Sequence, residues 1–249
     1  RHGVRGASRY RPFNADLTLD VLPDYLFSQA LIRYGLMLEQ PYSSESFRAQ
    51  PIWRIAARYG VRTGLIGLPL THPAEAASGF IVSDRFHRRN DRSVLDAGPA
   101  VAPTSLDDVA RTLLVAEESA APSASVPLDL MPASEQGSSI EADRVHHVLA
   151  RELAASEHVR LLAVRYAGLD AVGHYYLRFA DPASFGDVSE QERLRFGRVL
   201  DDYYAFVDSL VGDALSQLGP DDLLVVVSGF GMEAQTPGKR LLERLVGDP

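Results

Sequence analysis

Apolar and polar positions along the chain fall into blocks that predict helices and strands in alternation. Apolar residues that recur every three or four positions are typical of a helix with one buried face, whereas short continuous apolar runs are typical of strands. On this pattern we expect helices at residues 51–59, 105–118, 140–157 and 189–218. We expect strands at residues 61–68, 79–84, 159–166 and 223–227.

Residues at the helix ends support two of these helices. Pro51 suits the first turn of a helix, and Gly60 suits the position just after its last turn. Ser189 and Glu192 have the spacing of a capping box, in which each side chain accepts a hydrogen bond from the backbone of the other residue. The Gly219–Pro220 pair is typical of a helix end, so we predict one long helix between it and Ser189.

The apolar run at residues 223–227 decides the fold class. Leu and Val follow one another there without polar alternation, which indicates a strand buried on both faces. Alternating strands and helices then imply right-handed crossovers and an α/β domain whose doubly wound, mostly parallel sheet carries helices on both faces. We expect residues 1–249 to form part of one such domain, with residues 90–139 as an insertion or linker-rich segment within it.

Composition narrows the classes of function. A net charge of -8 and scattered basic residues argue against a nucleic-acid-binding surface. No apolar run approaches the roughly 18 residues that a membrane span needs. The absence of cysteine leaves His, Asp and Glu as the metal ligands to consider, and it leaves the compartment open. The chain starts at Arg1 without an initiator Met, and we interpret it as an excerpt of a longer protein.

The sequence YAGLDAVGHYY, residues 166–176, carries the strongest candidate chemistry. Asp170 and His174 lie four residues apart in a predicted glycine-punctuated loop just past the strand at 159–166, and a carboxylate and an imidazole so placed can share a divalent cation. Ligands of such sheets gather beyond the carboxyl ends of the strands, so this loop and the one at 228–232 are expected to face one crevice. Asp143 and His147 have the same spacing inside a predicted helix, and we expect them to be surface residues, as we do His146 and His158.

For the other candidate residues, a structural role is the more common alternative. Tyr175 is a candidate for stacking on a substrate, and packing is the alternative. Ser228 is a candidate donor to a phosphate, and a turn role is the alternative. His72 is expected to be structural. The basic cluster RFHRRNDR at residues 85–92 is expected to be a solvated loop, with an anion-attracting rim as the minority interpretation.

Several of these segments together resemble a known family. The sequence GLDAVGHYY is similar to the Asp-x-x-x-His metal motif of the alkaline phosphatase superfamily, in its type I phosphodiesterase/nucleotide pyrophosphatase branch. RHGVRG resembles the His-Gly that follows the nucleophile segment there, and IWRIAARYGVRTGLIGLPLTHPAE resembles the helix, strand and Pro-rich loop of that branch. VVVSGFGM stands where the family usually has Ser-Asp-His-Gly-Met. The likeness spans most of residues 1–90 and 140–235.

The resemblance implies a two-metal site, usually of zinc, and a Thr or Ser nucleophile that takes the phosphoryl group. Asp170 and His174 match ligands of the first metal. Gly229 and Phe230 occupy the positions of the second metal's Asp and His, and neither side chain can coordinate a cation. The nucleophile is expected upstream of Arg1, and the family's last histidine is expected beyond Pro249.

Three consequences of this departure stay open: a single-metal site, a substitute ligand such as Glu233, or a loss of hydrolysis. The leading hypothesis is a metal-dependent hydrolase of phosphate mono- or diesters with a reduced metal site and a small-molecule phosphoester substrate. The competing hypothesis is a catalytically inactive family member that binds a ligand or a partner. A mutase-like phosphoryl transferase is a third, more distant possibility, since one fold supports several chemistries.

Overall fold

The computed structural model describes residues 8–19, 26–75, 78–88, 98–120, 129–131, 133–229 and 231–234. The chain divides into two compact units. Unit 1 comprises Arg1–Ala116 and Val145–Arg165, and unit 2 comprises Glu117–Arg144 and Tyr166–Pro249. Within the described ranges, no helix is long and apolar enough to cross a membrane.

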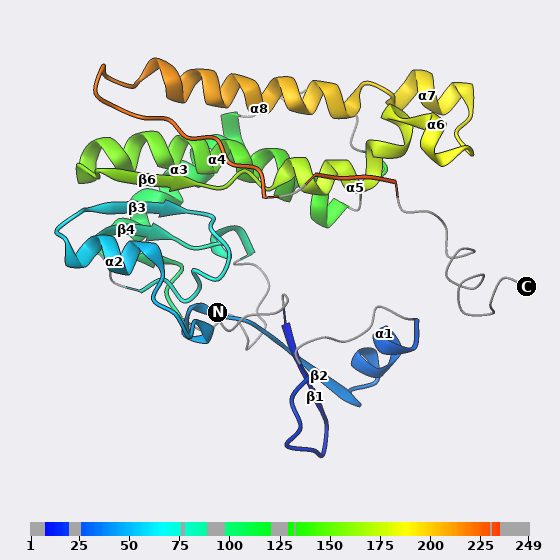
Figure 1. The fold of residues 1–249 in the computed structure, drawn as a ribbon, viewed down its shortest axis with the longest axis horizontal. Helices are drawn as coiled ribbons and strands as arrows, with labels where there is room; N and C mark the ends of the chain where they lie inside the picture. Colours follow the sequence, from blue (N-terminus) through cyan, green and yellow to red (C-terminus); the bar gives the residue numbers. More distant parts are fainter. Residues whose placement is uncertain are drawn as a thin grey trace, which may run out of the picture. The chain divides into compact units, whose positions relative to one another are not determined.

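Unit 1 is built on a four-stranded sheet with the order β5-β4-β3-β6. Figure 1 labels β4, β3 and β6 of this sheet. β3 pairs in parallel with β4 and with β6, whereas β4 pairs with β5 in antiparallel orientation. The strands are β3 (Thr63–Ile66), β4 (Gly79–Val82), β5 (Val101–Ala102) and β6 (Leu161–Val164). This mixed α/β arrangement with parallel strands confirms the coarse fold class expected from the sequence.

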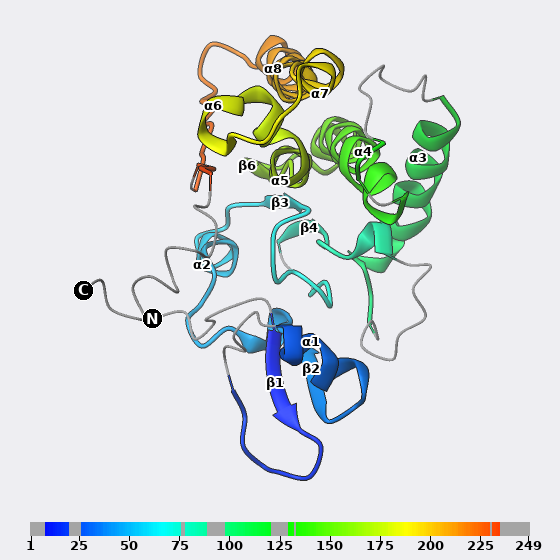
Figure 2. The same cartoon turned by 90° about the vertical axis from the view of Figure 1, so that its right-hand side faces the viewer.

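Helices pack on both faces of this sheet, because alternate side chains of each strand point to opposite faces. In Figure 2, β3 and β4 lie between α2 (Ile52–Arg58) and the helices α3 (Asp107–Ala120) and α4 (Ala133–Glu157). The core on the α3 and α4 side contains a large cluster of buried apolar residues. Its buried members are Ile66, Phe80, Val82, Phe86, Ala100, Val101, Ala110, Val145, Leu149, Ala150 and Leu153. On the α2 side, Leu65, Ala74, Ile81 and Ala102 are buried with Trp53 packed against them.

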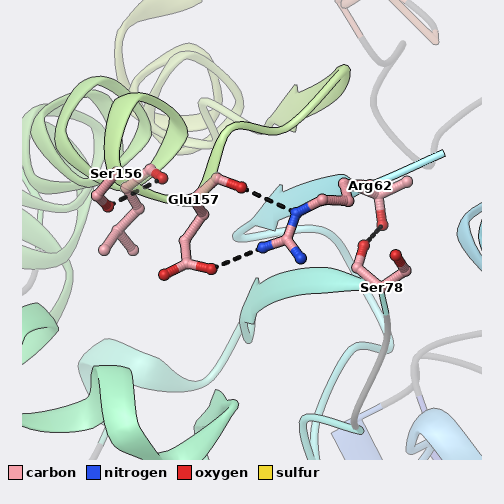
Figure 3. A network of polar contacts seen from close by, with 6 residues as sticks. Arg62, Ser78, Ser156 and Glu157 are labelled. Carbon is pink, nitrogen blue, oxygen red and sulfur yellow. Dashed lines mark hydrogen bonds and ion pairs between the residues drawn. The ribbon is translucent and has the colours of Figure 1, made fainter.

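An arginine ties the end of α4 to the start of β3 (Figure 3). Arg62 donates from Nε to the backbone carbonyl of Glu157 and from Nη2 to its carboxylate, both at 2.9 Å. The next residue, Thr63, begins β3, and its backbone N–H donates to the carbonyl of Ser78, just before β4, at 2.6 Å. The Arg62–Glu157 contact is partly exposed, so its charge attraction contributes at most about 1 kcal/mol.

A second small sheet belongs to unit 1. β1 (Ser8–Pro12) pairs with β2 (Met37–Pro41) in antiparallel register, and α1 (Leu26–Arg33) lies between them in the sequence. Short 3₁₀ turns lie at Ser44–Ser46, Phe86–Arg88 and Thr104–Leu106.

Unit 2 is helical. It contains α4 up to Arg144 and the helices α5 (Gly168–Ala180), α6 (Pro182–Phe185), α7 (Glu190–Phe196) and α8 (Val199–Ser216). α5, α7 and α8 share one apolar cluster whose buried members are Met131, Val172, Tyr176, Phe179, Phe196, Val199 and Tyr203. The capping box is confirmed: Ser189 Oγ accepts from the Glu192 N–H, and the Ser189 N–H donates to the Glu192 carboxylate.

The single long helix predicted after Ser189 is two helices in the structure. α7 ends at Phe196 and α8 begins at Val199, with Gly197 and Arg198 between them. Phe196 and Val199 are both buried in the same cluster. The break coincides with glycine, the residue besides proline that a helix interior favours least.

The strand predicted at residues 223–227 is not formed in the structure. The segment has no regular secondary structure, and Leu223, Val226 and Val227 are 85, 73 and 82% exposed. A run of Leu and Val becomes a strand only where a neighbouring strand accepts and donates its ladder of hydrogen bonds. The apolar run alone was therefore an insufficient signal.

Candidate metal centre

Asp170 and His174 lie one turn apart on the same face of α5. The side chains come within 3.8 Å of each other, from Asp170 Oδ1 to His174 Nε2, and they are 48 and 70% exposed. The loop predicted here is thus a helix, and the four-residue spacing brings the two groups together because a helical turn has 3.6 residues. Asp170 also lies in the first turn of α5, where a carboxylate interacts favourably with the helix dipole.

The geometry suits two ligands of one cation. Two ligands of a tetrahedral zinc ion, each at about 2 Å from the metal, lie about 3.3 Å apart. The observed 3.8 Å separates two solvent-exposed side chains that small rotations bring into that range. Among the residues that the structure describes, no group of three His, Cys, Asp or Glu side chains is placed to hold a metal ion. Asp170 and His174 are therefore a candidate pair, and a complete metal site is not formed within the described part of the chain.

A buried carboxylate supports the start of this helix. Asp143 on α4 is fully buried and accepts hydrogen bonds from the backbone N–H groups of Ala167 (2.8 Å) and Gly168 (3.0 Å). The expectation that Asp143 is a surface residue is wrong. The partners that allow its burial come from segments more than 20 residues away, so local sequence carries no signal of them.

Tyr203 on α8 completes this arrangement. Its hydroxyl donates to Asp143 Oδ2 at 2.9 Å, and it is fully buried. Burial and the adjacent Asp143 carboxylate raise the pKa of Tyr203, so the hydroxyl stays protonated and remains a donor. Burial, followed by the charges of Asp143 and Asp213, also raises the pKa of Tyr166 to about 12.

The SGFGM segment at residues 228–232 contacts α5. A Cβ atom built on Gly173 would lie 2.2 Å from Met232 Sδ, so the thioether occupies the space that a side chain at this position would take. Ser228 and Glu233 are exposed. A Cβ atom on Gly229 would meet nothing within 4 Å, and Phe230 lies outside the described residues.

The two tyrosines that follow His174 differ in environment. Tyr176 is fully buried in the unit 2 cluster, and its hydroxyl accepts from the Leu130 N–H at 3.1 Å, so it is a packing residue. Tyr175 is half-buried against the edge of the same cluster. Its suggested contact with substrate stays a prediction.

Two of the three histidines predicted at the surface are buried. His146 and His147 on α4 are 6 and 8% exposed, which corrects that expectation, whereas His158 is exposed as expected. His146 Nδ1 lies 3.0 Å from the Arg165 carbonyl, and its ring packs 4.8 Å from that of His87 between centroids. His72 is buried with Nδ1 3.3 Å from Ser83 Oγ, in agreement with the structural role expected for it.

Unit 1 also contains a pocket of about 210 Å³. It is lined by residues between Ser44 and Arg54 together with Thr71, Glu75 and Ile81. Phe47 and Trp53 meet edge to face in it at 5.9 Å between ring centroids. None of the residues proposed from the sequence for metal or substrate lines this pocket.

Family comparison agrees with the coarse fold class. A mixed α/β arrangement with parallel strands fits the alkaline phosphatase class. A model of the type I phosphodiesterase / nucleotide pyrophosphatase family matches residues 22–245, and the chain belongs to this family. No curated protein and no solved structure matches the chain. Members of the family are usually hydrolases of phosphodiesters and pyrophosphates and typically depend on divalent metal ions.

Proposed function

We propose that this chain contributes Asp170 and His174 to a divalent-cation site of a phosphodiester or phosphomonoester hydrolase. The observation that carries the proposal is their placement on one exposed face of α5, 3.8 Å apart, in a chain of this family. Zinc is the cation that best suits one carboxylate, one imidazole and no thiolate in a family of this chemistry.

Each residue of the proposed site has a distinct role. Asp170 supplies an anionic oxygen that offsets part of the cation's charge, and His174 ligates through a neutral imidazole nitrogen. A bound cation supplies Lewis-acid polarisation of a phosphoryl oxygen. Tyr175, next to His174, and Ser228 are proposed to contact the substrate, a small-molecule phosphoester.

We propose a reduced site with one cation held by this part of the chain. Gly229 and Phe230 offer no ligand where the family usually has Asp and His, and Glu233 is an exposed carboxylate nearby in sequence. The doubly wound topology and the insertion at residues 90–139 belong to the same proposal. They rest on the family's architecture and on the order of predicted elements.

The direct test is metal content of the full-length protein and two variants. Asp170→Asn and His174→Ala should each lose most of the bound zinc, because each substitution weakens or removes one of only two ligands that we propose for this part of the chain. His158→Ala is the matched control, since His158 is an exposed histidine in the turn that follows α4. Zinc stoichiometry in His174→Ala equal to that of the wild type would refute the assignment.

A second candidate function is binding without turnover. The absence of Asp and His at residues 229–230 favours it, because two-metal hydrolysis needs both cations to stabilise the attacking and leaving oxygens. Hydrolysis of bis(p-nitrophenyl) phosphate by the full-length protein, stimulated by zinc or manganese and abolished in His174→Ala, would exclude it. Zinc binding without any such hydrolysis would favour it.

A further inference from the structure

The helix that carries Asp170 and His174 has no capping side chain of its own. Its N-cap is Ala167, which makes no side-chain hydrogen bond. The first N–H groups of a helix have no partner within the helix and need one from elsewhere. Here the Asp143 carboxylate accepts from the N–H groups of both Ala167 and Gly168, although it lies 24 and 25 residues away in the sequence.

Tyr203 donates a further hydrogen bond to that carboxylate. Its hydroxyl donates to the same Oδ2 atom that accepts from Gly168, so α4, α5 and α8 meet at one oxygen. Gly168 makes this close approach possible. A Cβ atom on Gly168 would lie 1.7 Å from the Tyr203 hydroxyl oxygen and 2.9 Å from Asp143 Oδ2.

The candidate ligands depend on this helix start. Asp170 lies in the first turn of α5, three residues after Ala167, and His174 lies one turn further along. Both side chains are substantially exposed, so the helix backbone places them. A helix end that loses its capping partner frays within its first turn. Fraying there moves Asp170 away from His174.

We infer that Asp143, held by Tyr203, is a positioning residue that fixes the first turn of α5 and thereby the relative placement of Asp170 and His174. The expected effect on metal binding rests on the function proposed above, whereas the expected effect on the first turn of α5 does not depend on it. Helix order and metal affinity can therefore be tested separately.

Two substitutions and two controls test the inference in the full-length protein. Asp143→Asn keeps the size of the side chain but turns one oxygen acceptor into a donor, and Tyr203→Phe removes one donor. The controls are Asp201→Asn and Tyr204→Phe, which change exposed neighbours of Tyr203 on α8 in the same way. Three properties are measured: hydrogen–deuterium exchange of residues 166–172, Co²⁺ affinity from its absorption spectrum, and the thermal unfolding midpoint.

Asp143→Asn should speed exchange of the first-turn amides about tenfold or more, because a hydrogen bond to a charged acceptor is lost. It should weaken Co²⁺ binding about 10- to 100-fold, as loss of a ligand-orienting partner typically does. Tyr203→Phe should have the same effects to a smaller degree. Hydrogen–deuterium exchange and Co²⁺ affinity are measured at a temperature well below each variant's unfolding midpoint, so that only folded protein contributes.

The outcomes distinguish the positioning role of Asp143 from the proposed metal site. Unchanged first-turn exchange in Asp143→Asn, or in Tyr203→Phe if the first variant does not fold, overturns the inference. Faster exchange with unchanged Co²⁺ affinity, while His174→Ala loses Co²⁺, also overturns it and leaves the metal site standing. Unchanged Co²⁺ affinity in His174→Ala refutes the proposed function, and the exchange data then decide the helix-fixing role alone.

Discussion

Met232 occupies the space beside Gly173, with its Sδ atom 2.2 Å from where a Cβ on that glycine would lie. This contact joins the two sequence segments singled out for their chemistry, GLDAVGH and SGFGM, within unit 2. Gly173 directly precedes His174, so any change in this packing acts next to a candidate ligand. The contact explains why a residue without a side chain suits position 173, in the interior of a helix.

Substitution Gly173→Ala should leave α5 folded and displace Met232. Alanine favours a helix interior over glycine by up to about 1 kcal/mol, and the displaced atoms belong to the flexible end of a partly exposed side chain. We therefore expect faster oxidation of Met232 by hydrogen peroxide, measured by mass spectrometry of its peptide. The buried Met37 and Met131 serve as internal references.

Gly212→Ala is the control for this prediction. Gly212 lies within α8, and a Cβ there meets nothing within 4 Å. It should bring the same gain in helix propensity without any change at Met232. Equal Met232 oxidation rates in Gly173→Ala and the wild type would show that the contact is absent in solution.

Local signals in the sequence were sufficient for much of the fold. The helix expected from Pro51 to Tyr59 is α2, Ile52–Arg58, and its C-cap is Tyr59. Gly60 follows with φ of +71°, a backbone conformation that favours glycine. The capping box at Ser189 formed as expected, because its partners lie three residues apart. Such features depend on neighbours in the sequence, and the sequence shows those directly.

Features that depend on distant partners could not be predicted. Asp143 and Asp170 have histidines at the same spacing, yet the first is buried and the second is exposed. The difference comes from Tyr203, 60 positions from Asp143, and from the start of α5. Periodicity and spacing contain no information about these contacts. The predicted strand at 223–227 failed for a related reason, since strand formation requires a pairing partner.

Val227→Thr tests the exposed placement of that segment. Val227 is 82% exposed, so the substitution should change the free energy of unfolding by no more than about 0.5 kcal/mol. Val172→Thr, at a fully buried position of α5 in the same unit, should cost about 1–3 kcal/mol because it buries a hydroxyl. Urea denaturation gives both values. A loss in Val227→Thr as large as in Val172→Thr would mean that the segment is buried, as the sequence pattern suggested.

Gly64→Ala should destabilise the sheet of unit 1. A Cβ at this position of β3 would lie 2.6 Å from Cζ of Phe80, which is fully buried and has no room to retreat. Overpacking of this kind costs about 1–3 kcal/mol. Phe80→Leu in the same chain should recover part of the loss, so the double variant should be more stable than the sum of the two single changes predicts. Additive effects in urea denaturation would contradict the close approach.

The packed histidines of unit 1 should make its stability fall in acid. Burial lowers the pKa of His146 to about 4, even though the Arg165 carbonyl accepts from its ring, and burial together with His146 lowers the pKa of His87 to about 3. A depressed pKa means that the folded state binds fewer protons than the unfolded state below the ordinary value of 6.5. Stability is therefore complete above that pH and declines as the pH falls toward 4 and then 3.

For His146 alone the loss amounts to about 2 kcal/mol between pH 8 and pH 5, from the difference between the folded and unfolded pKa. Trp53 is the single tryptophan of the chain and lies in unit 1, so its fluorescence during urea denaturation reports this unit. His146→Gln should reduce the pH dependence by about that amount. His158→Gln, which changes an exposed histidine, should keep it. A wild-type unfolding free energy that is the same at pH 8 and pH 5 would show that these rings are already protonated or solvated in the folded protein.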